Sequence, residues 1–448
     1  MTEPARLWRI RLNGSVRARH LLVLYFAGFL TILMAVGVNT LQPYLLSTFL
    51  DLHVSQHGDA SGAVLTVGEF VAFVLVGIWG ALSDRAGRRF VYVTGFLIMG
   101  ASMLAMPMSH SLGGLFGARA LYSVGVAATT GMLTIIAADY IVNEDRGKGN
   151  AALGVANGLG AGLGAVLLSR LPLAFQNSGQ DPIAAGWYTY SCLAGICVLG
   201  AVVVRLSLVG GAERPTAAEE PPPLLVAMRD GLATARTDAV VAMSYAAAFV
   251  ARADLAIAGV FLPLWLTRHS YGELPEATRR MAEQSLCAAE AMAGDAEVQR
   301  ACVAVGEAAA EGVKAGGALI GVIGAAGLVA APLIGLLCDR INRSVALGIA
   351  LLINVIGYGM TGLIDDPTAG MVWGIVAVIG AGEACGVITS QVLIQQIAPA
   401  ERRGAVVGMF NVFGALGIMI CLFVGGKLFD HWTESGPFVF VAVLNLFV

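Results

Sequence analysis

Five ionisable side chains lie inside long apolar stretches of this 448-residue chain, where water cannot solvate them. They are Glu69, Arg119, Arg252, Asp254 and Glu383. A charge in such surroundings is costly, so it needs an opposite charge, a proton or a ligand beside it. The chemistry that these residue types indicate is the binding and release of protons or of a charged solute.

The depths of these residues within their stretches predict which of them are neighbours. At 1.5 Å per residue, Glu69 and Arg119 lie about 6 to 11 Å from the outer end of a helix, and Arg252 and Glu383 about 20 Å. We therefore predict one pair of Glu69 with Arg119 and another of Arg252 with Glu383. Because residues two apart lie about 200° around a helix, Asp254 must contact another helix, a water-filled cavity or a proton.

The composition indicates that these residues belong to a membrane protein. Of all residues, 57% are apolar and only 13% are charged, and the mean hydropathy is +0.77. An ordinary soluble domain carries about 25% charged residues. A net charge of -3 also argues against a nucleic-acid partner. The remaining class is an all-α, polytopic membrane protein in a lipid bilayer.

Eleven segments are long and apolar enough to cross a bilayer as helices, which takes roughly 20 residues. They are 20–48, 62–82, 90–108, 115–138, 149–175, 187–208, 240–266, 315–337, 345–364, 370–397 and 406–426. Residues 437–448 are too few to cross, so we expect the chain to end inside a twelfth helix. The first span is too long for the apolar part of a cleavable signal peptide.

The distribution of Lys and Arg predicts which end of the spans faces the cytoplasm. Of the 27 Lys and Arg residues, 18 precede the first span or fall in loops on that side, seven fall on the other side and two lie inside spans. Positive charge is enriched on the cytoplasmic side of membrane proteins. We expect a multi-pass protein of the cytoplasmic (inner) membrane with a cytoplasmic amino terminus.

An internal repeat divides the chain into two halves. Gly80 and Asp84 recur as Gly335 and Asp339 at an offset of 255 residues, and the segment 144–147 recurs at an offset of 257. Repeats of this kind are common in transporters. We predict an amino-terminal six-helix bundle at 1–208, a cytoplasmic linker at 209–239 and a carboxy-terminal six-helix bundle at 240–448.

The second half contains an extracytoplasmic insertion of about 35 residues, at about 268–314. It is rich in Ala and Glu, which favour helix, and it breaks at Gly294-Asp295, with Cys287 and Cys302 on either side of the break. In an oxidising compartment such a pair predicts a helical hairpin closed by a disulfide; the alternative is two unpaired cysteines. The hairpin could be a rigid cap, or a lid or docking site for a partner.

The decapeptide that follows the second span carries a recognisable pattern. Its fixed positions are Gly80, Asp84, Arg85, Gly87, Arg88 and Arg89. The pattern resembles the cytoplasmic loop signature G-x-L-a-D-r-x-G-r-r of the major facilitator superfamily (MFS), and the resemblance extends over essentially the whole chain. It implies the MFS fold, with twelve transmembrane helices in two halves, and secondary transport.

Two weaker motifs add to the resemblance. Arg119 begins a segment similar to the R-x-x-Q-G motif of the fourth span, with Tyr122-Ser123 in place of Gln-Gly. The fifth span has glycines at the spacing of the antiporter motif, but Leu163 stands where that motif has a proline. Antiport and symport therefore both remain open.

The loop signature has a physical interpretation as a gate. Asp84 can lie against the positive amino terminus of a helix that begins near Gly404, and Arg88 can bridge to Asp139. These contacts would close the cytoplasmic side, and Gly87 permits the tight turn. Asp339 and Arg343 would act likewise in the second half. The alternative is that these charges only set orientation.

Uncharged polar residues extend the cavity that the resemblance implies. They are Asn39, Gln42, Tyr122, Asn157, Gln391 and Asn411. Each could bind substrate, or could form only an interhelical hydrogen bond.

No sequence pattern indicates catalysis. The six histidines lack zinc-like spacing, and no phosphate-binding Gly-Lys-Ser/Thr loop is present. We expect no enzyme, no metal and no cofactor, with H+ as the coupling ion and a monomer as the working unit. Three functions remain open: a proton-coupled exporter of a drug or metabolite, which we favour; a proton-coupled importer of an organic anion or other metabolite; and a receptor or scaffold that uses the hairpin.

Overall fold

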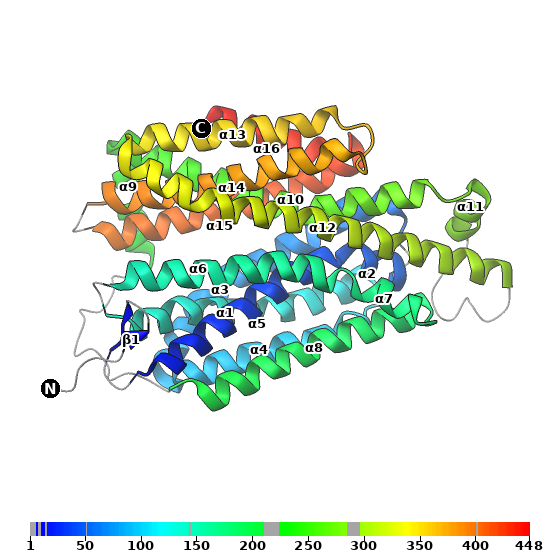
Figure 1. The fold of residues 1–448 in the computed structure, drawn as a ribbon, viewed down its shortest axis with the longest axis horizontal. Helices are drawn as coiled ribbons and strands as arrows, with labels where there is room; N and C mark the ends of the chain where they lie inside the picture. The colour runs from blue at the N-terminus through cyan, green and yellow to red at the C-terminus, as the bar shows by residue number, and fades with distance from the viewer. Residues whose placement is uncertain are drawn as a thin grey trace. The chain divides into compact units, whose positions relative to one another are not determined.

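The computed structural model describes residues 6–7, 10–13, 16–50, 52–142, 145–209, 224–284, 296–399 and 402–448. These residues are nearly all helical (Figure 1). The exception is a short antiparallel pair of strands, β1 (Arg6–Leu7) and β2 (Ile10–Arg11), in which Leu7 pairs with Ile10.

The helices of the first half precede residue 210. They are α1 (Ala18–Thr40), α2 (Gln42–Phe49), α3 (His57–Ala86), α4 (Arg88–Ala105), α5 (Leu112–Tyr140), α6 (Arg146–Leu163), α7 (Leu171–Asn177) and α8 (Pro182–Ser207). A 3-10 turn at Val54–Gln56 precedes α3, and a π-helical segment, Gly164–Leu168, follows α6.

The helices of the second half begin after the linker. They are α9 (Leu224–Thr237), α10 (Ala239–Gly272), α11 (Glu276–Gln284), α12 (Ala296–Arg340), α13 (Arg343–Met360), α14 (Gly370–Ile397), α15 (Arg403–His431) and α16 (Gly436–Phe447), with a 3-10 turn at Thr361–Leu363.

Ten helices of the described chain are long and apolar enough to span a membrane. The predicted span 90–108 corresponds to α4, which is not among the ten and has only 18 residues. This helix ends at Ala105, and its C-cap Met106 still has helical backbone, with φ −59° and ψ −53°. The next residue, Pro107, has no backbone N–H with which to continue the helical hydrogen bonds. The twelfth predicted helix corresponds to α16, a shorter apolar helix of 12 residues.

The chain forms two compact units, which differ from the predicted halves by two exchanged segments. Unit 1 comprises Met1–Val54, Val67–Thr216 and Ser270–Gly317, and unit 2 comprises Ser55–Thr66, Ala217–His269 and Ala318–Val448. The predicted insertion from residue 270 onward therefore belongs to the amino-terminal unit, and the start of α3 to the carboxy-terminal one.

Unit 1 is built on close helix pairs. In it α4 packs against α5 and α8, and α1 packs against α6. Gly160 and Gly164 of the fifth span face the backbone of α1 at Phe29 and Leu33. By contrast, a Cβ added at Gly158 would meet nothing within 4 Å. Only some of the glycines on this span are therefore required for packing.

Unit 2 is organised around α13, which packs against α14 and α16, while α15 packs against α9 and α16. Gly417 of α15 contacts the backbone of Phe249 in α10, so these helices also approach closely. Small residues permit such contacts in membrane bundles.

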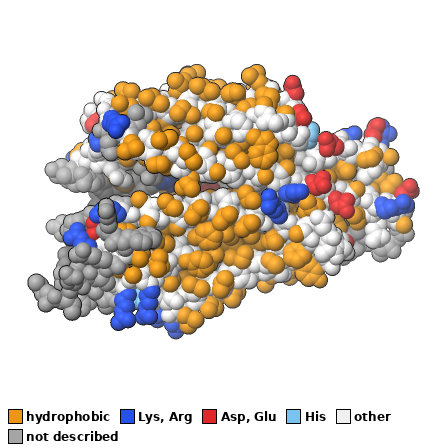
Figure 2. Space-filling model, viewed as in Figure 1, with side chains coloured by type: hydrophobic (Ala, Val, Ile, Leu, Met, Phe, Trp, Pro, Cys, Tyr) orange, Lys and Arg blue, Asp and Glu red, His pale blue; other side chains and the backbone are white. Residues whose placement is uncertain are grey.

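The sides of the helices carry exposed apolar side chains (Figure 2). Leu206 is 78% exposed, Val329 66% and Leu333 64%. In water such surfaces would associate, whereas lipid tails solvate them. This surface and the ten spans together are those of a multi-pass membrane protein.

The insertion is helical where the structure describes it. It contains α11 and the first part of α12, a continuous helix of 45 residues that goes on into the eighth predicted span. Cys302 is disulfide-bonded. Cys287 and the predicted break at 294–295 lie outside the described residues, so the pairing of Cys287 with Cys302 stays a prediction.

Candidate functional site

A cluster of buried polar side chains lies inside unit 2 around Asp254 of α10. The carboxylate of Asp254 accepts hydrogen bonds from Nδ2 of Asn354 in α13 at 2.9 Å and from Nδ2 of Asn445 in α16 at 2.9 and 3.0 Å. Tyr358 donates its hydroxyl to Glu383 of α14 at 2.5 Å and lies 2.8 Å from the carbonyl oxygen of Asp254. Four helices thus bring two carboxyl groups into one cluster.

This cluster is buried, and none of its five residues is a cation. All five are at most 2% exposed. Among the described residues, no ion pair joins Asp254 or Glu383 to a Lys, Arg or His side chain. Burying a carboxylate without a cation is costly. The arrangement therefore suits carboxyl groups that carry protons.

Arg252 lies on another side of α10. Its Nη2 donates to Oδ1 of Asn411 in α15 at 2.6 Å, and its side chain packs against Gly414. We predicted that Arg252 pairs with Glu383, whereas the contacts described here join Arg252 to Asn411 and Glu383 to Tyr358. Asp254, which we expected to need another helix, a cavity or a proton, contacts two other helices.

The predicted residues of unit 1 meet at Arg119 of α5, which is only 3% exposed. Its Nη2 donates to Oδ1 of Asn39 in α1 at 2.7 Å, and its guanidinium carbon lies 4.9 Å from the ring centre of Tyr122. Glu69 of α3 is half-buried and acts on Arg119 by Coulomb attraction. Four of the predicted residues are therefore neighbours.

The other predicted polar residues are more dispersed. Gln42 is buried one turn beyond Asn39. Asn157 is half-buried on α6, where its Oδ1 lies 2.9 Å from the position that a Cβ of Gly28 would occupy. Gln391 is exposed on α14.

The loop signature forms a charged cluster at the end of α3 and the start of α4. Arg88 contacts Asp139 of α5 at 3.2 Å through Nε, and Ser83 and Asp84 at 2.5 Å each through Nη1. Gly87 has a φ of +97°, a conformation that side chains rarely permit. The bridge from Arg88 to Asp139 thus has the partners that we predicted.

Three further residues of the signature have different surroundings. Arg85 is exposed, and a Cβ at Gly80 would meet nothing within 4 Å. Arg89 donates to the carbonyl oxygen of Leu208 at 3.3 Å.

The second copy of the signature turns differently. Asn342 replaces the glycine, has a φ of −59° and caps α13 by accepting the N–H of Ser344 at 2.9 Å. Arg343 is half-buried at the start of α13. The side chain of Asp339 lies outside the described residues.

The family model described as Major Facilitator Superfamily matches residues 24–294 and 301–448. The chain belongs to this superfamily. Its relatives include Magnetosome protein MamH of Paramagnetospirillum magneticum (strain AMB-1), with 25% identity over 446 residues that cover 97% of this chain and 92% of MamH.

Two further proteins resemble this chain, one over a shorter segment and the other at lower sequence identity. Citrate exporter 1 of Aspergillus niger is 28% identical over 150 residues, which cover 34% of this chain and 28% of the exporter. A crystal structure of the nucleoside transporter NupG aligns with a TM-score of 0.66 at 14% identity, covering 95% of this chain and 96% of NupG. This structural likeness supports the MFS fold.

Sequence reasoning missed three members of the buried cluster in this MFS protein, namely Asn354, Tyr358 and Asn445. The two asparagines lie in apolar helices, so a search of those helices for polar residues would have found them. Within the described ranges, no group of three or more His, Cys, Asp or Glu side chains could hold a metal ion.

A second missed feature is an amino-terminal strap, which we define as residues 10–13. Leu12 pairs with Ile141 in an antiparallel bridge. Arg11 donates to Asp145 from its backbone N at 3.0 Å and its Nε at 2.8 Å, and Lys148 contacts the same carboxylate at 2.8 Å. We had assigned the amino-terminal arginines only to orientation, since their partner lies in a distant loop.

The strap supplies a test of local stability. Arg11, followed by Lys148, holds the pKa of Asp145 well below its usual range. The stabilisation is therefore complete at neutral pH and is lost as the pH falls from the ordinary pKa of a carboxyl group through this lowered value. We expect Asp145→Ala to make tryptic cleavage after Arg11 several-fold faster.

Cleavage after Arg280, far from the strap in sequence, is the internal control and should not change. An unchanged rate after Arg11 in the variant would contradict the role of this carboxylate.

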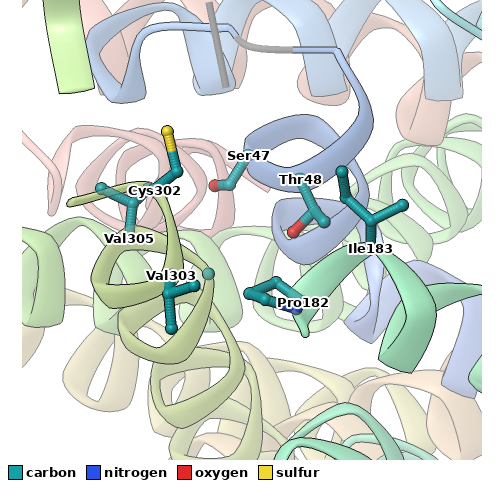
Figure 3. A pocket seen from close by; sticks show the side chains of 8 residues that line it. Ser47, Thr48, Pro182, Ile183, Cys302, Val303 and Val305 are labelled. Carbon is teal, nitrogen blue, oxygen red and sulfur yellow. The ribbon is translucent and has the colours of Figure 1, made fainter. Parts of the chain in front are cut away.

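The part of α12 that belongs to unit 1, residues 296–317, packs on α7 and α8. Gln176 of α7 donates to the carbonyl oxygen of Gly306 at 3.2 Å, and a Cβ at Gly306 would overlap Pro182. A small pocket of ≈ 300 Å³, which includes the solvent at its mouth, remains beside this contact (Figure 3). Its lining comes from α2, α8 and α12 and consists of Ser47, Thr48, Pro182, Ile183, Cys302, Val303, Val305 and Gly306.

Proposed function

We propose that the chain is a proton-coupled secondary transporter that moves a small organic solute across the cytoplasmic membrane by alternating access. The observation that carries the proposal is the buried pair of Asp254 and Glu383. Tyr358 bridges Glu383 to the backbone of Asp254, and no cation of the described chain forms an ion pair with either carboxyl. One or both carboxyl groups bind a proton in this buried cluster and release it when the cluster opens to water.

The direction we propose is export, driven by protons that enter. The local similarity to Citrate exporter 1 supports this direction. We further propose H+ as the only coupling ion, no cofactor, a monomer as the working unit and a cytoplasmic amino terminus. The cluster of Arg88, Asp84 and Asp139 supports a cytoplasmic gate, because it holds the inner ends of α3, α4 and α5 together.

The test uses purified protein in liposomes with an inward proton gradient and a pH indicator inside. Pools of organic acids and of amphiphilic compounds are loaded in turn inside and outside the vesicles. We expect protons to enter only when a particular solute is present inside, with loss of that solute.

Proton entry that requires the solute outside would overturn export in favour of import. Absence of solute-dependent proton movement with every pool would overturn the proposal and favour a receptor.

A further inference from the structure

Unit 1 contains buried hydrogen-bond donors that have no acceptor among the described residues. Arg119 is 3% exposed and uses Nη2 to donate to Asn39. Within the part of the chain that the structure describes, its Nε and Nη1 have no hydrogen-bond partner. A guanidinium in dry surroundings that uses one of its three nitrogens lacks most of the acceptors it needs.

Two neutral donors of unit 1 show the same deficit, one beside Arg119 and one on the helix pair that carries its partner Asn39. Tyr122 lies under the guanidinium and is 2% exposed, yet its hydroxyl has no partner among the described residues. Gln42, also 2% exposed, likewise has no described acceptor for its Nε2. It follows Asn39 by three residues, so both lie on one face of the α1–α2 helix pair.

The unsatisfied atoms have a common chemistry. Arg119 Nε, Arg119 Nη1 and Gln42 Nε2 are donors only, and the hydroxyl of Tyr122 can donate. Polar atoms buried without partners destabilise a fold, so such atoms are rarely left in a native core. A single ligand group with several acceptor oxygens and a negative charge would satisfy all of these donors together.

The backbone of α3 lies close to the guanidinium of Arg119. Gly68 of α3 faces Arg119, and a Cβ there would lie 3.1 Å from Nε and 2.8 Å from Oγ of Ser123. Glu69, which also lies on α3, attracts Arg119. It forms no hydrogen bond with Nε or Nη1 of Arg119. Glu69 therefore does not take the place of the missing acceptor.

We propose that the transported solute is an organic anion, and that Arg119, Tyr122 and Gln42 bind its carboxylate within unit 1. This inference rests on the proposed transport function and adds the substrate class to it. Unit 1 recognises the anion, while the carboxyl cluster of unit 2 binds the proton.

The test measures binding without any proton gradient. The thermal unfolding midpoint of the purified full-length protein is followed in detergent against increasing citrate or succinate at constant ionic strength, with succinamide as the uncharged match. We expect at least one of the two carboxylates to raise the midpoint and succinamide to leave it unchanged.

The variants separate binding from a structural role. Tyr122→Phe and Gln42→Leu each remove a donor that has no described acceptor, so the ligand-free protein should unfold at the same or a higher temperature. Each variant should weaken carboxylate binding by about fivefold to tenfold. Arg119→Gln should abolish it, while Arg170→Gln, which removes an exposed arginine of the same unit, should bind as the wild type does.

The wild type failing to respond to either carboxylate would overturn the inference. So would an unchanged response in Tyr122→Phe and Gln42→Leu, which carry the test even where Arg119→Gln does not fold. A carboxylate response without proton movement in liposomes would instead retain the anion site and overturn the proposed coupling.

Discussion

Asp254→Asn is expected to abolish uphill solute movement in liposomes while the protein remains folded. With a pH difference of one unit, each coupled proton supplies about 1.4 kcal/mol, which sustains a solute ratio of about tenfold. The asparagine cannot release a proton, so the ratio should fall to about one. Glu383→Gln, which can still accept the hydroxyl of Tyr358, should have a similar effect.

The cluster explains why the Asp254→Asn variant should fold. Its amide oxygen can still accept from Asn354 or Asn445. Its new N–H group can donate to the Oδ1 atoms of these asparagines, which have no partner among the described residues. Exchange of labelled solute at equal concentrations should therefore persist.

The matched control is Asp238→Asn, because Asp238 is a carboxylate at the start of the same helix that caps the N–H groups of Val240 and Val241. An asparagine retains that cap, so full coupling is expected. Proton-driven accumulation that survives in Asp254→Asn would show that this carboxyl is not the coupling group.

Two glycines of α6 should respond in opposite ways to the same substitution. In Gly160→Ala the new Cβ would overlap the carbonyl oxygen of Phe29 and lie 3.1 Å from the backbone N of Leu33. Overpacking of this kind costs about 1–3 kcal/mol, and backbone atoms cannot rotate away. The unfolding temperature and the yield of folded protein should both fall.

Gly158→Ala is the control within the same helix. A Cβ there meets nothing within 4 Å, and alanine favours helix over glycine by up to about 1 kcal/mol. Its unfolding temperature, measured by intrinsic fluorescence in detergent, should be unchanged or higher. Equal behaviour of the two variants would contradict the packing of α6 on α1.

The helical membrane fold was accessible from the sequence because its signals are local. An apolar stretch of about 20 residues predicts a span whatever surrounds it. Accordingly, the predicted span 370–397 has the bounds of α14. The predicted span 90–108 extends three residues beyond α4, since hydropathy alone does not register that Pro107 lacks the N–H that would continue the helix.

Depth along a helix predicts which residues lie at one level, but not which of them are in contact. Depth along a helix suggested the pair of Arg252 and Glu383, yet depth leaves the rotation of each helix undetermined. Arg252 faces Asn411, and Tyr358 faces Glu383. The proximity of Arg119 to Tyr122, by contrast, follows from the sequence, because residues three apart share a helix face.

The strap has a consequence for biosynthesis. Arg11 and Asp145 are 134 residues apart in the chain. At a synthesis rate of 5–20 residues per second, Arg11 leaves the ribosome about 7 to 27 s before Asp145 does. During this interval the amino-terminal arginines are available to orient the first helices, and only afterwards can Arg11 pair with the loop after α5. One residue thus serves membrane insertion first and the folded state later.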